Sequence, residues 1–122
     1  MTQYWRSLLS TDNDVESFTF TATGTLYSSW VNISSYNELI SFLEATYTNQ
    51  SGATLDVSIE IYNPLTGTAF THTSHTQLTA TGAEHKGMTV FAGQARVKLV
   101  AGGTFGASES IVATVDFYGK NT

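Results

Sequence analysis

The sequence contains no cysteine and only one proline, and charged side chains make up 12% of its 122 residues. The lack of cysteine excludes disulfide bonds, thiolate chemistry and cysteine-ligated zinc or iron–sulfur sites. No apolar stretch approaches the roughly 20 residues that a membrane helix needs, and no charged start followed by an apolar run marks a signal peptide. We therefore expect a protein that binds no membrane and is made in the cytoplasm without a signal peptide.

Positive charge is also scarce, because the formal net charge is −5 and the few basic residues are scattered. Binding to nucleic-acid phosphates requires clustered lysine and arginine side chains, so we expect no nucleic-acid partner. The basic residues are Arg6, Lys86, Arg96, Lys98 and Lys120.

Threonine and serine take the place of charged residues, with 20 and 13 copies respectively. Because 41% of the residues are hydrophobic and 12% are aromatic, the composition is not that of a disordered chain. Threonine fits the pleated surface of a β-sheet, where hydroxyl groups pair across strands. A chain of this length forms one domain, and its core is large enough to be stable without disulfides.

The clearest element is residues 53–63, in which apolar side chains occupy every second position. Successive side chains of a strand point to opposite faces, so this pattern predicts a strand with one buried and one solvated face. Proline and glycine in the following Asn63-Pro64-Leu65-Thr66-Gly67 predict a turn. The core residues of this strand are Leu55, Val57, Ile59 and Ile61, while Asp56 and Glu60 lie on its solvated face.

Residues 37–48 fit two kinds of element. Leu39, Phe42 and Leu43 have helical spacing, and Ser35 followed by Glu38 matches a capping box. The same run fits a strand that is buried on both faces. Because the surrounding elements are strands, we favour a strand here.

The remaining segments give about eight short strands, with turns about every 8–14 residues. This spacing favours an antiparallel sandwich over a parallel fold, which would need helical crossovers. We predict an all-β fold in which residues 15–122 form a single antiparallel β-sandwich that is jelly-roll-like. The other expected segments are residues 16–23, 26–33, 69–72, 75–80, 88–91, 94–101 and 110–118.

Residues 1–14 fit the strand pattern least. They form either a first edge strand packed on the core or an N-terminal arm whose aromatic residues dock onto a neighbouring subunit, and both alternatives stay open. The predicted partner-binding residues of this segment are Tyr4, Trp5, Arg6, Leu8 and Leu9.

Three histidines raise the question of a metal site, and His72 and His75 lie only three positions apart. Two such residues on one strand point to opposite faces, and a structural zinc site needs four ligands. His85 and Glu84 would have to complete the set. We expect no bound metal and no cofactor.

The sequence also lacks the usual signatures of hydrolases. No Gly-x-Ser-x-Gly elbow is present, and Ser74 beside His75 is adjacency in sequence, which does not make a catalytic dyad. Asp56, Glu60 and Asp116 would be the carboxylates of a glycosidase pair, but charges on a solvated strand face are better explained by solubility. We expect no catalytic residues and a protein that is not an enzyme.

Several aromatic residues suit either of two roles. Aromatic planes stack on sugar rings, so they would line a carbohydrate-binding face, or they pack across strands. The residues concerned are Tyr27, Trp30, Tyr36, Tyr62 and Tyr118.

A series of short motifs carries a family resemblance. The motifs are Trp-Val-Asn-Ile-Ser at 30–34, Tyr-Asn-Glu-Leu at 36–39, Gly-Ala-Thr-Leu-Asp-Val-Ser-Ile at 52–59, Thr-Gln-Leu-Thr-Ala-Thr-Gly at 76–82, Arg-Val-Lys at 96–98, Gly-Gly-Thr at 102–104 and Phe-Tyr-Gly-Lys at 117–120. In this order they resemble small β-sandwich structural proteins of tailed bacteriophages and prophages, over about residues 17–120. Similar domains often carry an Asp-Gly-Gly/Ser turn and a Trp after the central strand, where this chain has residues 63–67 and Phe70.

This resemblance implies a non-enzymatic structural virion protein, and above all a capsid decoration (cement) protein. Such a protein would bind the outer surface of the major capsid lattice and stabilise the shell. The resemblance implies the major capsid protein as partner, a homo-oligomer that is either a dimer or a trimer, and a location on the capsid exterior. Two alternatives stay open, a carbohydrate-binding β-sandwich module and a head-fibre, tail or baseplate component.

Overall fold

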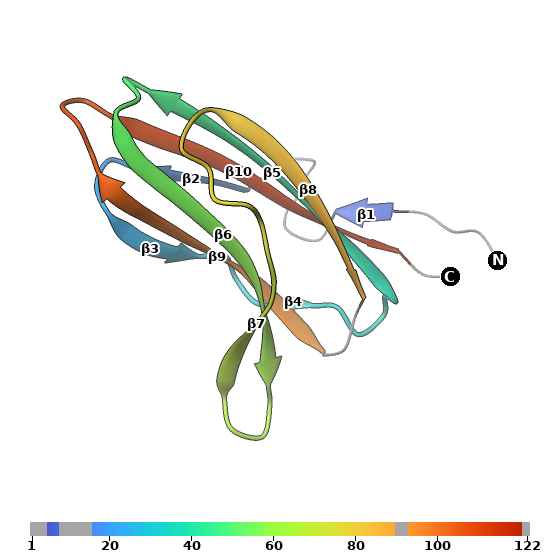
Figure 1. Cartoon of the computed structure of the whole chain (residues 1–122). Helices are drawn as coiled ribbons and strands as arrows, with labels where there is room; N and C mark the ends of the chain where they lie inside the picture. The colour runs from blue at the N-terminus through green and yellow to red at the C-terminus, as the bar shows by residue number, and fades with distance from the viewer. Residues whose placement is uncertain (1–4, 8–15, 90–92, 121–122) are drawn as a thin grey trace.

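A computed structural model describes residues 5–7, 16–89 and 93–120. Among these residues every regular element is a β-strand, and none forms a helix that could cross a membrane. The strands form two sheets packed face to face (Figure 1). Sheet A contains β1 (Trp5–Ser7), β2 (Glu16–Phe20), β5 (Glu38–Thr48), β8 (Gly82–Thr89) and β10 (Ser110–Lys120). Sheet B contains β3 (Gly24–Tyr27), β4 (Val31–Asn32), β6 (Gly52–Asn63), β7 (Thr68–Ser74) and β9 (Gln94–Thr104).

The strand order of each sheet is that of a jelly roll. In sheet A, β10 and β5 are central, β8 forms one edge, and β1 and β2 both pair with the other side of β10. In sheet B, β9 and β6 are central, β7 forms one edge, and β3 and β4 share the other. With each split edge counted as one strand, the ten strands become eight, and all pairs are antiparallel. The predicted fold class is confirmed.

The core lies between the two sheets and follows from the alternation of each strand. On β6 the side chains of Leu55, Val57 and Ile59 are buried, and on β10 those of Val115 and Phe117 are buried too. Side chains on the two inner faces interdigitate in such a sandwich, which removes their apolar surface from water. Burial of every second residue is therefore what holds the two sheets together.

The predicted solvated face of β6 differs from expectation at its end. Glu60 retains only 6% of its surface exposed, because Arg96 on β9 lies opposite it and forms an ion pair with its carboxylate. Ile61, predicted to be a core residue, is half-buried. It lies where β6 enters the β6–β7 hairpin, which projects beyond the rest of the sandwich (Figure 1). The expectation that Glu60 is inert exposed surface was wrong.

Residues 37–48 form a strand rather than a helix, as favoured from the sequence. This strand is β5, which spans Glu38–Thr48. Its inner side chains are buried, including Leu39 and Leu43, while Phe42 on the opposite face is 41% exposed. The strand is therefore buried on one face only, and the expected burial on both faces was wrong. Within the described residues, the contacts between strands indicate no third layer packed on the outer face of sheet A.

Candidate partner-binding surfaces

Two of the five N-terminal candidate residues, Trp5 and Arg6, belong to β1 at an edge of sheet A. The backbone of β1 pairs with the end of β10, with Trp5 opposite Lys120 and Arg6 opposite Gly119. Tyr4, Leu8 and Leu9 lie outside the described residues, as do the side chains of Trp5 and Arg6. The structure therefore gives the backbone location of residues 5–7 alone, and the partner-binding role of the five residues stays a prediction.

The outer face of sheet A, next to β1, carries a shallow cavity of about 690 Å³. Phe42 and Tyr118 meet edge to face there, with ring centroids 5.5 Å apart, and the ring of His85 lies 6.2 Å from that of Phe42. The carboxylates of Glu44 and Asp116 also line this cavity. The surface thus combines aromatic rings with carboxylates, Asp116 lying directly opposite Phe42, and we call it the sheet A face.

The three carboxylates considered as a glycosidase pair do not come together. Asp56 is exposed on sheet B and accepts a hydrogen bond from the amide of Gln77 at 2.9 Å. Glu60 is paired with Arg96, and Asp116 lies on the other sheet, where its Oδ1 accepts a hydrogen bond from the backbone N–H of Phe117. A glycosidase needs two carboxylates facing one bond, so these residues supply no such pair.

The outer face of sheet B carries a stacked arginine. The guanidinium of Arg96 lies 4.0 Å from the ring centroid of Tyr27 and 4.4 Å from that of Trp30. Its Nε donates to Glu60 Oε1 at 2.8 Å, and Trp30 packs edge-on against Tyr62 with centroids 5.2 Å apart. We call these five residues the Arg96 cluster. It unites three of the aromatic residues that the sequence indicated, whereas Tyr36 packs against Gly119 and Tyr118 lies on the sheet A face.

The three histidines lie in different surroundings. His75 is buried, His72 is half-buried with its Nδ1 2.7 Å from the hydroxyl of Thr73, and His85 is exposed on the sheet A face. No group of three side chains suited to hold a metal ion occurs in the part of the chain that the structure describes.

His75 instead joins Ser41 and Glu84 in a hydrogen-bonded chain. Its Nε2 lies 2.9 Å from Ser41 Oγ, and its Nδ1 lies 2.9 Å from Glu84 Oε1. Burial lowers the pKa of His75, so the ring is neutral at pH 7. The hydrogen bond from the backbone N–H of Thr76 is the main cause that lowers the pKa of Glu84 to about 2. Because a carboxylate only accepts, Nδ1 donates to Glu84 and Nε2 accepts from the Ser41 hydroxyl.

This chain of groups has the order of a hydrolase triad but not its accessibility. A nucleophilic serine must meet its substrate, and Ser41 has no exposed surface at all. Sequence reasoning missed the arrangement, because Ser41 and His75 are 34 residues apart and no local motif links them. We interpret it as a buried polar network that fixes the segment between β7 and β8.

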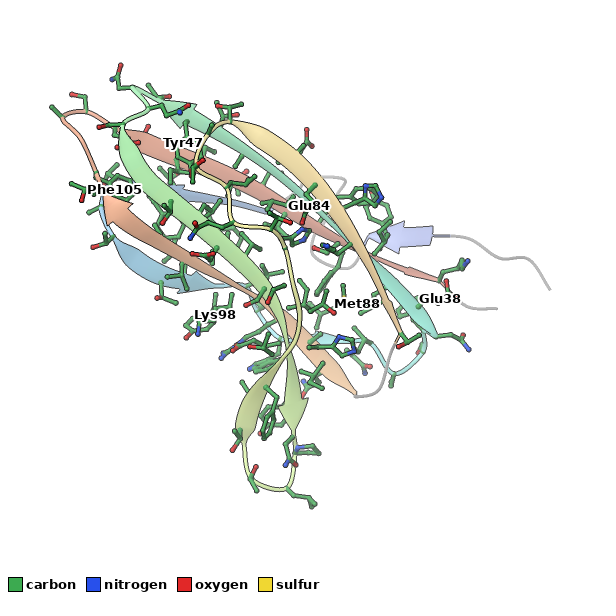
Figure 2. The ribbon with its side chains drawn as sticks, viewed as in Figure 1. Glu38, Tyr47, Glu84, Met88, Lys98 and Phe105 are labelled. Carbon is green, nitrogen blue, oxygen red and sulfur yellow. The ribbon has the colours of Figure 1, made fainter. Side chains whose placement is uncertain are left out.

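The same segment closes one side of the sandwich. After β7 it continues along β6, where His75 N donates to Val57 O and Leu55 and Leu78 exchange two backbone hydrogen bonds. It then crosses to sheet A, where the Tyr47 hydroxyl donates to Leu78 O. Figure 2 shows Glu84 on β8 with its side chain on the side of this crossing segment. These bonds connect the two sheets at the β7 and β8 edges.

The buried carboxylate of Glu109 holds the turn between β5 and β6. Glu109 accepts hydrogen bonds from the backbone N–H groups of Gly106 and Ser51, at 2.8 and 2.7 Å. These bonds lower the pKa of Glu109, the one from Gly106 most of all. The loop between β9 and β10 is thereby attached to the turn that precedes β6.

Comparison with solved structures finds this fold in virus particles. A chain from the structure of infectious bursal disease virus Gx strain aligns with 98% of this chain at a TM-score of 0.60 and 17% identity. A chain from the crystal structure of the VP2 subviral particle of that virus aligns with 98% of it at a TM-score of 0.54 and 15% identity. Both alignments cover 32% of the virus chain, so the present chain spans about a third of its length.

The likeness at these identities concerns the fold alone. A CBM36-1 domain of a multidomain xylanase, from the hindgut metagenome of Trinervitermes trinervoides, aligns over 97% of each chain at a TM-score of 0.47 and 8% identity. No protein-family model matches the sequence, and no curated protein matches it either.

Proposed function

We propose that this chain is a non-enzymatic structural protein of a tailed-bacteriophage virion, and that it decorates the capsid exterior as a cement protein. The observation that carries the proposal is the strand order, because it is a complete jelly roll and aligns over 98% of the chain with chains of a viral particle. The resemblance of the sequence motifs to phage β-sandwich proteins points to the same class.

The buried chemistry supports a role without catalysis. Within the described residues, the grouping that has catalytic order is Ser41, His75 and Glu84, and its serine is closed to solvent. The network instead ties a crossing segment to sheet A. A rigid body of this kind suits a protein whose task is to bridge neighbouring subunits of a shell.

The sheet A face and the adjoining N-terminal segment are the surfaces that we assign to the shell. An exposed aromatic ring such as Phe42, packed here against the half-buried Tyr118, anchors protein interfaces because it buries much area at little cost in side-chain entropy. Ser7 lies opposite Tyr118, so β1 lies at the border of this face. The partner is the major capsid protein, and a dimer or trimer would match a symmetry axis of the lattice.

The abundance of the protein in the virion tests the proposed location. We expect quantitative mass spectrometry of purified virions to give a copy number close to that of the major capsid protein, because a cement protein occupies repeated lattice sites. A few copies per particle would instead indicate a fibre, tail or baseplate component. Absence from purified virions would contradict a structural virion role altogether.

Deletion of residues 1–10 tests the N-terminal contact. We expect the shortened protein to bind capsids that lack it at least about tenfold more weakly, or to form a smaller oligomer, because an aromatic anchor is lost. Co-sedimentation with capsids and analytical ultracentrifugation measure the two properties. The matched control is Leu65→Ser at the β6–β7 hairpin tip, where Leu65 is 92% exposed. Unchanged binding together with unchanged oligomer size would contradict the contact.

A further inference from the structure

The Arg96 cluster leaves most donors of its guanidinium available. Within the described residues, Arg96 donates one side-chain hydrogen bond, from Nε to Glu60, and its terminal amino groups donate none. A guanidinium carries five N–H donors, so four remain for a bound group or water. The side chain keeps 22% of its surface exposed, which leaves these donors within reach of a ligand.

The position of the guanidinium is fixed before any ligand arrives. Glu60, whose side chain is 8% exposed, holds Nε, and the rings of Tyr27 and Trp30 lie against the guanidinium at 4.0 and 4.4 Å. A side chain ordered in this way loses little rotamer entropy on binding. Its two terminal amino groups form a planar fork that matches both oxygens of a carboxylate. The cluster is therefore a preorganised receptor for a carboxylate.

The surface beside the fork is aromatic and carries a second cation, while Glu60 and Asp56 place two carboxylates on the same face of sheet B. Lys98 lies directly opposite Tyr27 in the β3–β9 pairing, on the outer side of sheet B, and Figure 2 shows it there. Two of the five basic residues of an acidic chain thus lie on this face. Tyr27 is 45% exposed, and the face of its ring that Arg96 does not cover presents a negative π-surface that attracts the C–H groups of a sugar ring. An acidic peptide would use the fork but leave this ring unused.

We propose that the Arg96 cluster binds a carboxylated sugar, the uronate residue of an acidic polysaccharide. The carboxylate accepts hydrogen bonds from the terminal amino groups of Arg96, and the sugar ring packs against Tyr27. The ammonium group of Lys98 attracts the carboxylate, and added salt weakens this attraction. This activity goes beyond attachment to a shell, because it lies on sheet B, whereas the sheet A face serves the capsid. A particle carrying many copies would adhere to acidic glycans through multivalent contacts.

The proposal is tested by titrating the full-length protein with trigalacturonate, followed by NMR and calorimetry. We expect saturable binding with a dissociation constant below about 1 mM, and binding at least about tenfold weaker for neutral galactotriose and for triglutamate. Arg96→Lys keeps the charge beside Glu60 but loses the planar fork, and Tyr27→Ala removes the exposed ring. Each change should weaken trigalacturonate binding at least about tenfold. Phe70→Ala, at an exposed aromatic of β7 that belongs to neither surface, is the matched control and should leave it unchanged.

Each opposite outcome overturns the proposal. Equal binding of galactotriose would exclude a carboxylate site, and equal binding of triglutamate would indicate a general anion site. Binding that survives Tyr27→Ala, or that Phe70→Ala weakens as much, would remove the site from the Arg96 cluster. No binding at 10 mM trigalacturonate, which is about tenfold above the expected dissociation constant, would contradict the proposal. Thermal unfolding of each variant separates lost binding from lost folding, and Tyr27→Ala leaves the Arg96–Glu60 pair in place if Arg96→Lys does not fold.

Discussion

Replacement of Phe117 by alanine is expected to lower the free energy of unfolding by about 3–5 kcal/mol. Phe117 has no exposed surface and heads the fully buried side chains when these are ranked by volume. It lies on β10, a central strand of sheet A, opposite Ser41 of β5. Its removal loses the transfer free energy of the ring and leaves a cavity that two sheets cannot close without distortion. Because domains of this kind are stable by about 5–15 kcal/mol, the loss is a large share of the total.

Urea unfolding followed by circular dichroism measures this loss. The matched control is Val112→Thr on the same strand, since Val112 is 39% exposed on the opposite face and threonine keeps a β-branched side chain. It should change stability by no more than about 0.5 kcal/mol. If Phe117→Ala does not fold, Phe117→Leu gives a smaller loss of the same sign. Equal losses of stability for Val112→Thr and the Phe117 variants would show that the face of β10 that carries Phe117 does not face the core.

Acidification is expected to destabilise the fold in two steps through the Ser41–His75–Glu84 network. Burial lowers the pKa of His75 below its ordinary value of 6.5, and the nearby Lys86 and His85 act in the same direction. Below pH 6.5 the unfolded chain therefore binds a proton at His75 that the folded protein resists, and stability falls with pH. The second loss of stability comes from Glu84, between pH 4.5 and about 2, because in this range the carboxyl is protonated in the unfolded chain and still ionised in the folded protein.

The size of the Glu84 step follows from its pKa. A fall in pKa from 4.5 to about 2 corresponds to at most about 3 kcal/mol of stability, all of it present at pH 7. Glu84→Gln should remove this contribution, so its thermal midpoint should drop at pH 7 and then change less than that of the unaltered protein between pH 5 and pH 3. Glu44→Gln, at an exposed glutamate of the same sheet, is the control for net charge. Calorimetry from pH 7 to pH 3 measures the midpoints, and parallel profiles for all three proteins would contradict the role of Glu84.

Sequence reasoning recovered the strands whose alternation is strong and missed most of the one whose alternation is weak. β6, β9 and β10 were predicted nearly to their ends, because their apolar side chains occupy every second position. The expected segment 88–91 reached only the last two residues of β8 (Gly82–Thr89), because only Ala83 and Met88 of the strand are apolar and they fall on opposite faces. The strand expected at residues 75–80 was wrong, since these residues form only an isolated bridge at Leu78. An edge strand that is half-buried at most leaves little hydrophobic pattern to detect.

The candidate sites were less predictable than the fold. The sequence indicated Tyr27, Trp30 and Tyr62 as aromatic residues of interest. Nothing in it indicated that the guanidinium of Arg96 lies against two of these rings, or that Glu60 is buried and forms an ion pair with Arg96. Glu60 and Arg96 are 36 residues apart and meet only through the pairing of β6 with β9. Contacts of this range depend on strand register, which no local pattern specifies.

The sequence by itself determined that this chain is all-β, that its strands are half-buried, and that cysteine chemistry plays no part in it. These properties are local, because side-chain alternation and composition act within a few residues. Only the tertiary structure decided which strands pair, that residues 37–48 form a strand, and that Ser41, His75 and Glu84 meet in the interior. Those outcomes depend on burial and hydrogen bonds between residues far apart in the chain, and such contacts exist only once the two sheets have packed together.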